Sequence, residues 1–108
     1  MIVHAAIPTD VPLGSSIEGV IRIEPNPARE NAVIHYRVGR DGTAVRLMIY
    51  DVTGRLVSTL RDDVSSSGSH HATWNGRRGE GGSASAGIYF VVLEIGNRRE
   101  AGKLVLLR

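Results

Sequence analysis

The sequence contains no cysteine and only one lysine, Lys103, among its 108 residues. The lack of cysteine excludes disulfide bridges, thiolate catalysis and cysteine-bound zinc. No apolar run approaches the roughly 20 residues that a membrane-spanning helix requires, so we expect no membrane insertion. Aromatic residues make up 5% of the chain, which leaves few rings for an exposed sugar-binding platform once a core has been filled.

The length and the composition are those of one globular domain, with 42% hydrophobic and 22% charged residues. Residues 1–18 contain Pro8, Pro12 and Gly14 and are typical of a linker, so we place the folded domain at residues 19–108. Residues 1–8 lack the basic start and the long apolar stretch of a signal peptide. If the domain is exported, we expect the signal peptide to belong to a longer parent chain.

Apolar residues recur at every second position in several short segments, and no segment shows a helical period. Strands are predicted for residues 19–24, 31–38, 44–50, 55–60, 70–75, 88–95 and 101–107. Seven short strands separated by turns predict an all-β fold, an immunoglobulin-like β-sandwich of about seven antiparallel strands.

Three turn signals predict how neighbouring strands connect. Asp41 and Gly42 form a dipeptide favoured in hairpins, so we expect residues 31–38 and 44–50 to pair. A second hairpin is predicted around Gly96. The strand at 55–60 is expected to end at Asp62 and Asp63, before a serine-rich loop that runs to Gly68.

The segment "DVTG" predicts a tight turn with a structural role. Asp51 stands first and Gly54 fourth, which fits a turn in which the Asp51 carboxylate accepts a hydrogen bond from the Thr53 amide. Gly54 would supply a left-handed backbone. These backbone requirements explain the residues without any chemistry at the corner.

Trp74, the single tryptophan, is expected to fill the core between the sheets. Glu94 marks one face of its strand as solvated, so the opposite face is expected to point inward. The inward residues would be Tyr89, Val91, Leu93 and Ile95. The solvated face also carries Ile88, Phe90 and Val92, an apolar patch that could receive a partner or be covered by the linker.

The side chains that could bind a metal do not form a convincing set. His70 and His71 are neighbours on a predicted strand and point to opposite faces, so they cannot hold one ion together. Calcium needs six or more oxygens, and no dense array of Asp and Asn supplies them. The other candidate ligands are His4, His35, Asp10, Asp51, Asp62 and Asp63. We expect no metal site and keep weak calcium binding as a minor alternative.

No catalytic residue can be assigned either. The serines at 65–67 lack the glycine-flanked elbow of a hydrolase nucleophile. The glycines of segment 76–87 precede another strand, whereas a phosphate-binding loop opens a helix, so we interpret this segment as a flexible connection. We expect a protein that is not an enzyme and needs no cofactor.

Basic and acidic residues are nearly balanced, with 13 against 11. Antiparallel strands would place their connections alternately at the two ends of the domain. One end would then carry Arg29, Glu30, Asp51, Arg77, Arg78 and Glu80, and the other Arg40, Asp41, Arg61, Asp62, Asp63, Arg98, Arg99 and Glu100. Because both signs are mixed at each end, we expect no nucleic-acid partner; the two arginine pairs remain local contact points.

Five motifs in order resemble a known family. These are "PNP" at residues 25–27, "VRLMIYDVTGRLVSTL", "SGSHHATWNGR", "AGIYFVVLEIGN" and "KLVLLR". The order is similar to that of the carboxy-terminal sorting domains of the type IX secretion system (type A) and of the immunoglobulin-like domain of flagellar hook-capping proteins. The resemblance covers roughly residues 23–108.

The resemblance implies a non-enzymatic sorting domain of a larger exported protein, which directs its cargo across the outer membrane to the cell surface. The implied partners are the secretion machinery or domains of the parent chain, and the implied location is secreted or cell-surface. The matching recognition stretch is Lys103, Leu104, Val105, Leu106, Leu107 and Arg108.

Two other functions and one structural question stay open at this stage. The domain could be a structural spacer or assembly module, as in the hook cap, or a carbohydrate-binding accessory module that uses Tyr50. The stretch "KLVLL" has no polar face, so it is either buried or left as an edge that another chain could extend. Simple core packing is the favoured interpretation.

Overall fold

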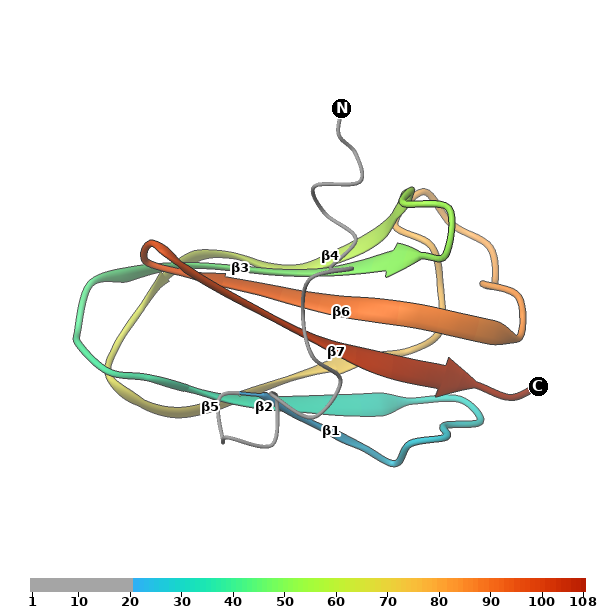
Figure 1. Ribbon diagram of the computed structural model, residues 1–108, viewed down its shortest axis with the longest axis horizontal. Coiled ribbons are helices and arrows are strands. Elements are labelled where there is room, and N and C mark those ends of the chain that lie inside the picture. Colours follow the sequence, from blue (N-terminus) through green and yellow to red (C-terminus); the bar gives the residue numbers. More distant parts are fainter. Residues whose placement is uncertain (1–20) are drawn as a thin grey trace.

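The computed structural model describes residues 21–108, which form seven strands and no helix (Figure 1). No helix long and apolar enough to cross a membrane was found in the described residues. The strands are β1 (Ile21–Glu24), β2 (Ala32–Val38), β3 (Thr43–Asp51), β4 (Leu56–Ser65), β5 (Gly68–Trp74), β6 (Gly87–Ile95) and β7 (Arg98–Leu106). The predicted linker at 1–18, including His4 and Asp10, and residues 19–20 of the first predicted strand lie outside the described residues.

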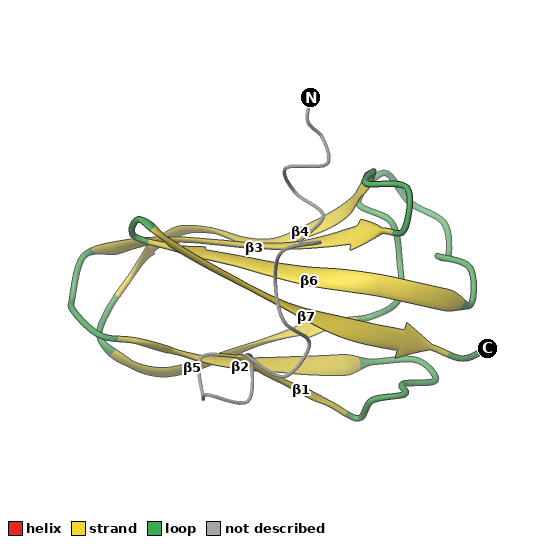
Figure 2. Cartoon of the chain, in the orientation of Figure 1, coloured by secondary structure: helices red, strands yellow, loops and turns green. Residues whose placement is uncertain are grey.

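Two antiparallel sheets face each other across one core (Figure 1). One has the order β1-β2-β5 and the other β4-β3-β6-β7, and the connecting loops gather at the two ends of the sandwich (Figure 2). The all-β sandwich of seven antiparallel strands predicted from the sequence is confirmed.

The strand alternation explains where the core sits. Ile34 on β2, Leu47 on β3 and Leu93 on β6 are each fully buried and belong to the same cluster between the sheets. Successive residues of a strand point to opposite faces, so alternate positions from both sheets meet in the middle. Burial of each such side chain contributes about 1.5–3 kcal/mol to folding.

The predicted hairpin between residues 31–38 and 44–50 is wrong. β2 pairs with β1 and β5, whereas β3 pairs with β4 and β6, so the chain crosses from one sheet to the other between them. Gly42 has the expected positive φ of 77°, but it serves this crossover. β2 and β3 each bury one apolar face in the same core, so they pack across it instead of sharing hydrogen bonds.

β4 is longer than predicted, because it continues through Asp62 and Asp63 to Ser65. Charged residues fit there because β4 is an edge strand, where side chains can remain in water. Arg46 of β3 lies 3.9 Å from Asp62 across this pair of strands, and Arg61 lies 3.7 Å from Asp63. These charges therefore belong to a strand surface and not to an end loop.

The hairpin of β6 and β7 is confirmed, with Ile95 paired to Arg98 around Gly96. The inward side of β6 is buried as expected, at Tyr89, Val91, Leu93 and Ile95. The outward side differs from the prediction, because Val92 is also buried. It forms a small second cluster with Met48 and Ala101. Only Ile88 remains well exposed on this face of β6, at 42%, and Phe90 is half-buried.

Trp74 lies in the core and its ring contacts Tyr89 edge-on, with the ring centres 5.2 Å apart. Its indole Nε1 donates a hydrogen bond of 2.8 Å to the carbonyl of Arg77. The Tyr89 hydroxyl donates to the carbonyl of Ser85. The two rings therefore fasten the core to the loop that joins β5 and β6.

Candidate recognition site

The stretch singled out from the sequence, residues 103–108, is mostly the end of β7. Leu104 and Leu106 point into the core and are at most 1% exposed. Lys103 and Leu107 are exposed on the other side, and Val105 is half-buried there. The stretch therefore has an inward face that holds the sandwich together and an outward face that can be contacted.

The outer edge of this part of β7 is already occupied by the chain between β1 and β2. The Asn26 side chain donates to the Lys103 carbonyl at 2.8 Å and accepts from the Val105 amide at 3.0 Å. The Ala28 amide donates to the Val105 carbonyl, and its carbonyl accepts from the Leu107 amide. β7 is the edge strand of its sheet, but backbone pairing by another strand is thus blocked at residues 103–107.

The outward residues form a continuous surface with the neighbouring strand. Ile88 is paired with Val105, and Phe90 is paired with Lys103, so their side chains lie next to each other on one face of the sheet. Together with Leu107 these residues make up what we call the outer patch: Ile88, Phe90, Lys103, Val105 and Leu107. Two of its apolar side chains are well exposed, Ile88 at 42% and Leu107 at 39%.

Arg108 ties the end of this stretch to the glycine-rich segment. Its guanidinium donates to the Gly76 carbonyl at 2.6 Å and to the Ala84 carbonyl at 3.2 Å. Gly76 has a φ of +75°, and a Cβ there would lie 2.6 Å from the guanidinium. A glycine is therefore favoured at position 76 by the backbone conformation, and a Cβ there would also displace the Arg108 guanidinium.

The glycine-rich segment connects β5 to β6 but is hydrogen-bonded rather than loose. The Gly79 amide donates to the Val57 carbonyl at 2.8 Å, and the Ala84 amide donates to the Gly76 carbonyl at 2.9 Å. Because this connection leads into a strand, it offers no helix N-terminus to an anion.

The turn at Asp51 has the predicted residues in the predicted contacts. One carboxylate oxygen accepts hydrogen bonds from the Thr53 amide at 2.9 Å, the Thr53 hydroxyl at 2.7 Å and the Arg55 amide at 3.0 Å. Gly54 has a φ of 91° and donates to the Asp51 carbonyl. Partial burial opposes ionisation of Asp51, but the hydrogen bonds from Thr53 and Arg55 outweigh it and hold the pKa below its usual value.

We expect Asp51→Ala to lower the free energy of unfolding by about 1–2 kcal/mol at pH 7, because three donors lose their acceptor. A depressed folded-state pKa means that this contribution is complete above the unfolded pKa of about 3.9 and disappears as the pH falls through the folded-state value. Urea unfolding at pH 7 and pH 2.5 measures both effects. Asp62→Ala, at an exposed strand position, is the control. An equal loss from Asp51→Ala at both pH values would contradict the assignment.

The candidate metal ligands stay apart in the described part of the chain. His70 stacks on Tyr36, whereas His71 lies beside His35 on the other face. The Nε2 of His35 lies 2.9 Å from a Glu24 carboxylate oxygen. Residues 21–108 contain no group of three or more His, Asp or Glu side chains placed to hold a metal ion.

Tyr50, the side chain considered for sugar binding, is half-buried against the Met48 and Val92 cluster. Its hydroxyl lies 3.6 Å from the Met48 sulfur. Its ring is therefore largely used for packing and is not displayed as an open platform.

Comparison with known proteins supports the order of motifs in the sequence and the β-sandwich seen in the structure. The sequence pattern that defines the FlgD Ig-like domain family matches residues 27–98. The chain belongs to this FlgD Ig-like family. No curated protein sequence matches the chain.

Among solved structures, this FlgD Ig-like domain is similar to part of dimeric latent PorU from Porphyromonas gingivalis. The sequences are 26% identical and the TM-score is 0.61. The match covers 81% of this chain and 9% of the PorU chain, so the domain spans only a small part of that protein. Both resemblances found in the sequence, to hook-cap immunoglobulin-like domains and to type IX sorting domains, are supported.

Proposed function

We propose that this FlgD Ig-like domain is a non-enzymatic sorting module that directs an attached protein through the type IX secretion machinery to the cell surface. The observation that carries the proposal is the similarity to part of PorU, which extends over 81% of the chain. The secretion machinery, or another domain of the parent chain, is the proposed partner. In this role the domain needs no catalytic centre and no cofactor.

The structure favours recognition through side chains over recognition through strand addition. Asn26 and Ala28 occupy the edge of β7, so a partner cannot extend the sheet at residues 103–107. Within residues 21–108, the outer patch on β6 and β7 leaves Ile88 and Leu107 exposed, with Lys103 supplying a charge beside these apolar side chains. An exposed apolar patch with a polar rim is typical of a protein interaction site.

A reporter fusion tests the sorting role. We expect a periplasmic reporter joined to the amino end of this chain to reach the surface of a host that has a type IX system, as measured by surface antibody labelling. The same fusion in a strain without that system is the control and should stay in the periplasm. A folded fusion protein retained in the periplasm of the competent host would contradict the proposal.

A second candidate function is an assembly module, which the FlgD Ig-like match favours. In that case the domain would associate with copies of itself or with parent-chain domains. Light scattering over a range of protein concentrations separates the two functions. Discrete oligomers would favour assembly, whereas a monomer at all concentrations would favour sorting.

A further inference from the structure

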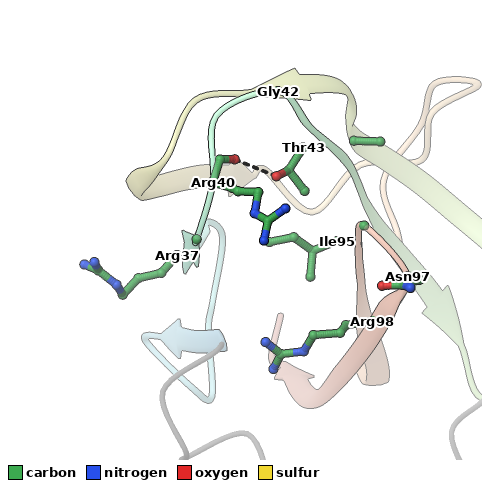
Figure 3. A pocket seen from close by; sticks show the side chains of 10 residues that line it. Arg37, Arg40, Gly42, Thr43, Ile95, Asn97 and Arg98 are labelled. Atoms are coloured by element: carbon green, nitrogen blue, oxygen red, sulfur yellow. Dashed lines mark hydrogen bonds between the residues drawn. The ribbon is translucent and has the colours of Figure 1, made fainter.

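A hollow of about 830 Å³ opens at the end of the sandwich where the β2–β3 crossover meets the β6–β7 hairpin (Figure 3). Its lining comes from both sheets. The side chains that matter here are Arg37, Arg40, Thr43, Ile95, Asn97 and Arg98. The volume is within the range of about 300–1,000 Å³ that is usual for ligand sites.

The hollow is strongly basic, because every charged residue that lines it in the described chain is an arginine. Arg40 and Arg98 extend toward the opening from opposite sides, with Ile95 between them, whereas Arg37 points away at the rim (Figure 3). Arg37 donates to the Ser69 hydroxyl, and Arg98 lies 3.3 Å from a Glu100 carboxylate oxygen.

The nearest acidic residue on the crossover is held elsewhere. The Asp41 carboxylate accepts a hydrogen bond of 2.7 Å from the amide of Ser67, on the turn between β4 and β5. That hydrogen bond holds the pKa of Asp41 below its usual value. One carboxylate oxygen of Asp41 is therefore engaged with Ser67 on the neighbouring turn.

The two turns that carry the arginines are fixed by hydrogen bonds. The Thr43 hydroxyl donates to the Arg40 carbonyl, the Gly42 amide to the Ser65 carbonyl and the Gly96 amide to the Ala44 carbonyl. These glycine amides are therefore used inside the fold and cannot form the backbone cradle typical of phosphate sites. The remaining donors include planar guanidinium groups, which match planar carboxylates with two parallel hydrogen bonds.

We propose that this hollow binds carboxylate side chains of an acidic segment of a partner protein. Arg40 and Arg98 hold the carboxylates, and the Asn97 amide adds a donor. The guanidinium groups are exposed, so the binding is weak and depends on salt. This inference goes beyond the sorting function, and its test does not depend on export.

Fluorescence anisotropy of the whole chain with labelled tetraglutamate tests the site. The variant is R40Q/R98Q, and the matched control is R29Q/R55Q, which removes the same charge from exposed positions elsewhere. We expect R40Q/R98Q to bind the peptide about tenfold more weakly, and the control less than about threefold more weakly. Tetraglutamine should not bind, and inorganic phosphate should compete only at much higher concentration.

Three outcomes would overturn the proposal. The first is an equal loss in the two variants, which would show only an effect of net charge. The second is displacement of tetraglutamate by phosphate at equal concentration, which would assign the site to small anions. The third is no binding of tetraglutamate by the unaltered chain at low salt. These arginines lie outside the core, so each variant should fold. Circular dichroism and urea unfolding check this.

Discussion

Replacing Trp74 with alanine is expected to lower the free energy of unfolding by about 3–5 kcal/mol. Trp74 is 1% exposed and contacts Tyr89, so its removal leaves a large cavity between the sheets. The Arg77 carbonyl also loses its donor, the indole Nε1 at 2.8 Å. Because small domains are stable by only about 5–15 kcal/mol, this loss is a large fraction of the total stability.

Urea unfolding followed by circular dichroism measures this loss, and Trp74→Phe is the matched control. Phenylalanine keeps an aromatic ring against Tyr89 but cannot donate to Arg77, so its cost should be clearly smaller than that of alanine. A change below about 1 kcal/mol for Trp74→Ala would show that the tryptophan does not hold the two sheets together.

Replacing Leu104 with alanine is expected to cost about 2–5 kcal/mol, the second large effect. Leu104 is fully buried and belongs to the main core cluster, although it lies within the stretch proposed for recognition. Leu107→Ala is the matched control, because this leucine is 39% exposed in the same stretch. Its cost should stay below about 1 kcal/mol.

The two leucine variants also separate folding from recognition. Leu104→Ala should reduce export only as far as it unfolds the domain, whereas Leu107→Ala should affect export without a matching loss of stability. Equal and small stability changes in both variants would contradict the division of this stretch into an inward and an outward face. The stabilities are compared by urea unfolding at pH 7 on purified protein, and export is compared by surface antibody labelling of the reporter fusion.

The alternation of apolar residues predicted the strands well, because each strand buries one face and exposes the other. The alternation could not predict which strands pair with each other. Residues 31–38 and 44–50 show the same pattern whether they pair as a hairpin or face each other across the core, and the turn at Gly42 fits both. The structure shows the second arrangement.

Contacts that depend on long-range geometry were not visible in the sequence. Asn26 stands between two prolines just after the first predicted strand, yet its side chain caps the edge of β7, 77 and 79 residues further along the chain. The alternation of connections placed Arg40 and Arg98 at the same end of the domain, but it did not predict that they line one hollow together with Arg37. These arginines come together because β2 ends and β7 begins at the same end of the sandwich.

The most direct test of the sorting function is the surface fraction of a reporter fused to the I88S/L107S variant. Both changes lie in the outer patch, where the side chains are exposed, so the domain should remain folded. The matched control is V52S/V64S, which alters two exposed valines elsewhere. We predict that I88S/L107S lowers surface display by about tenfold or more while the control leaves it unchanged. Undiminished display by a folded I88S/L107S protein would contradict the account.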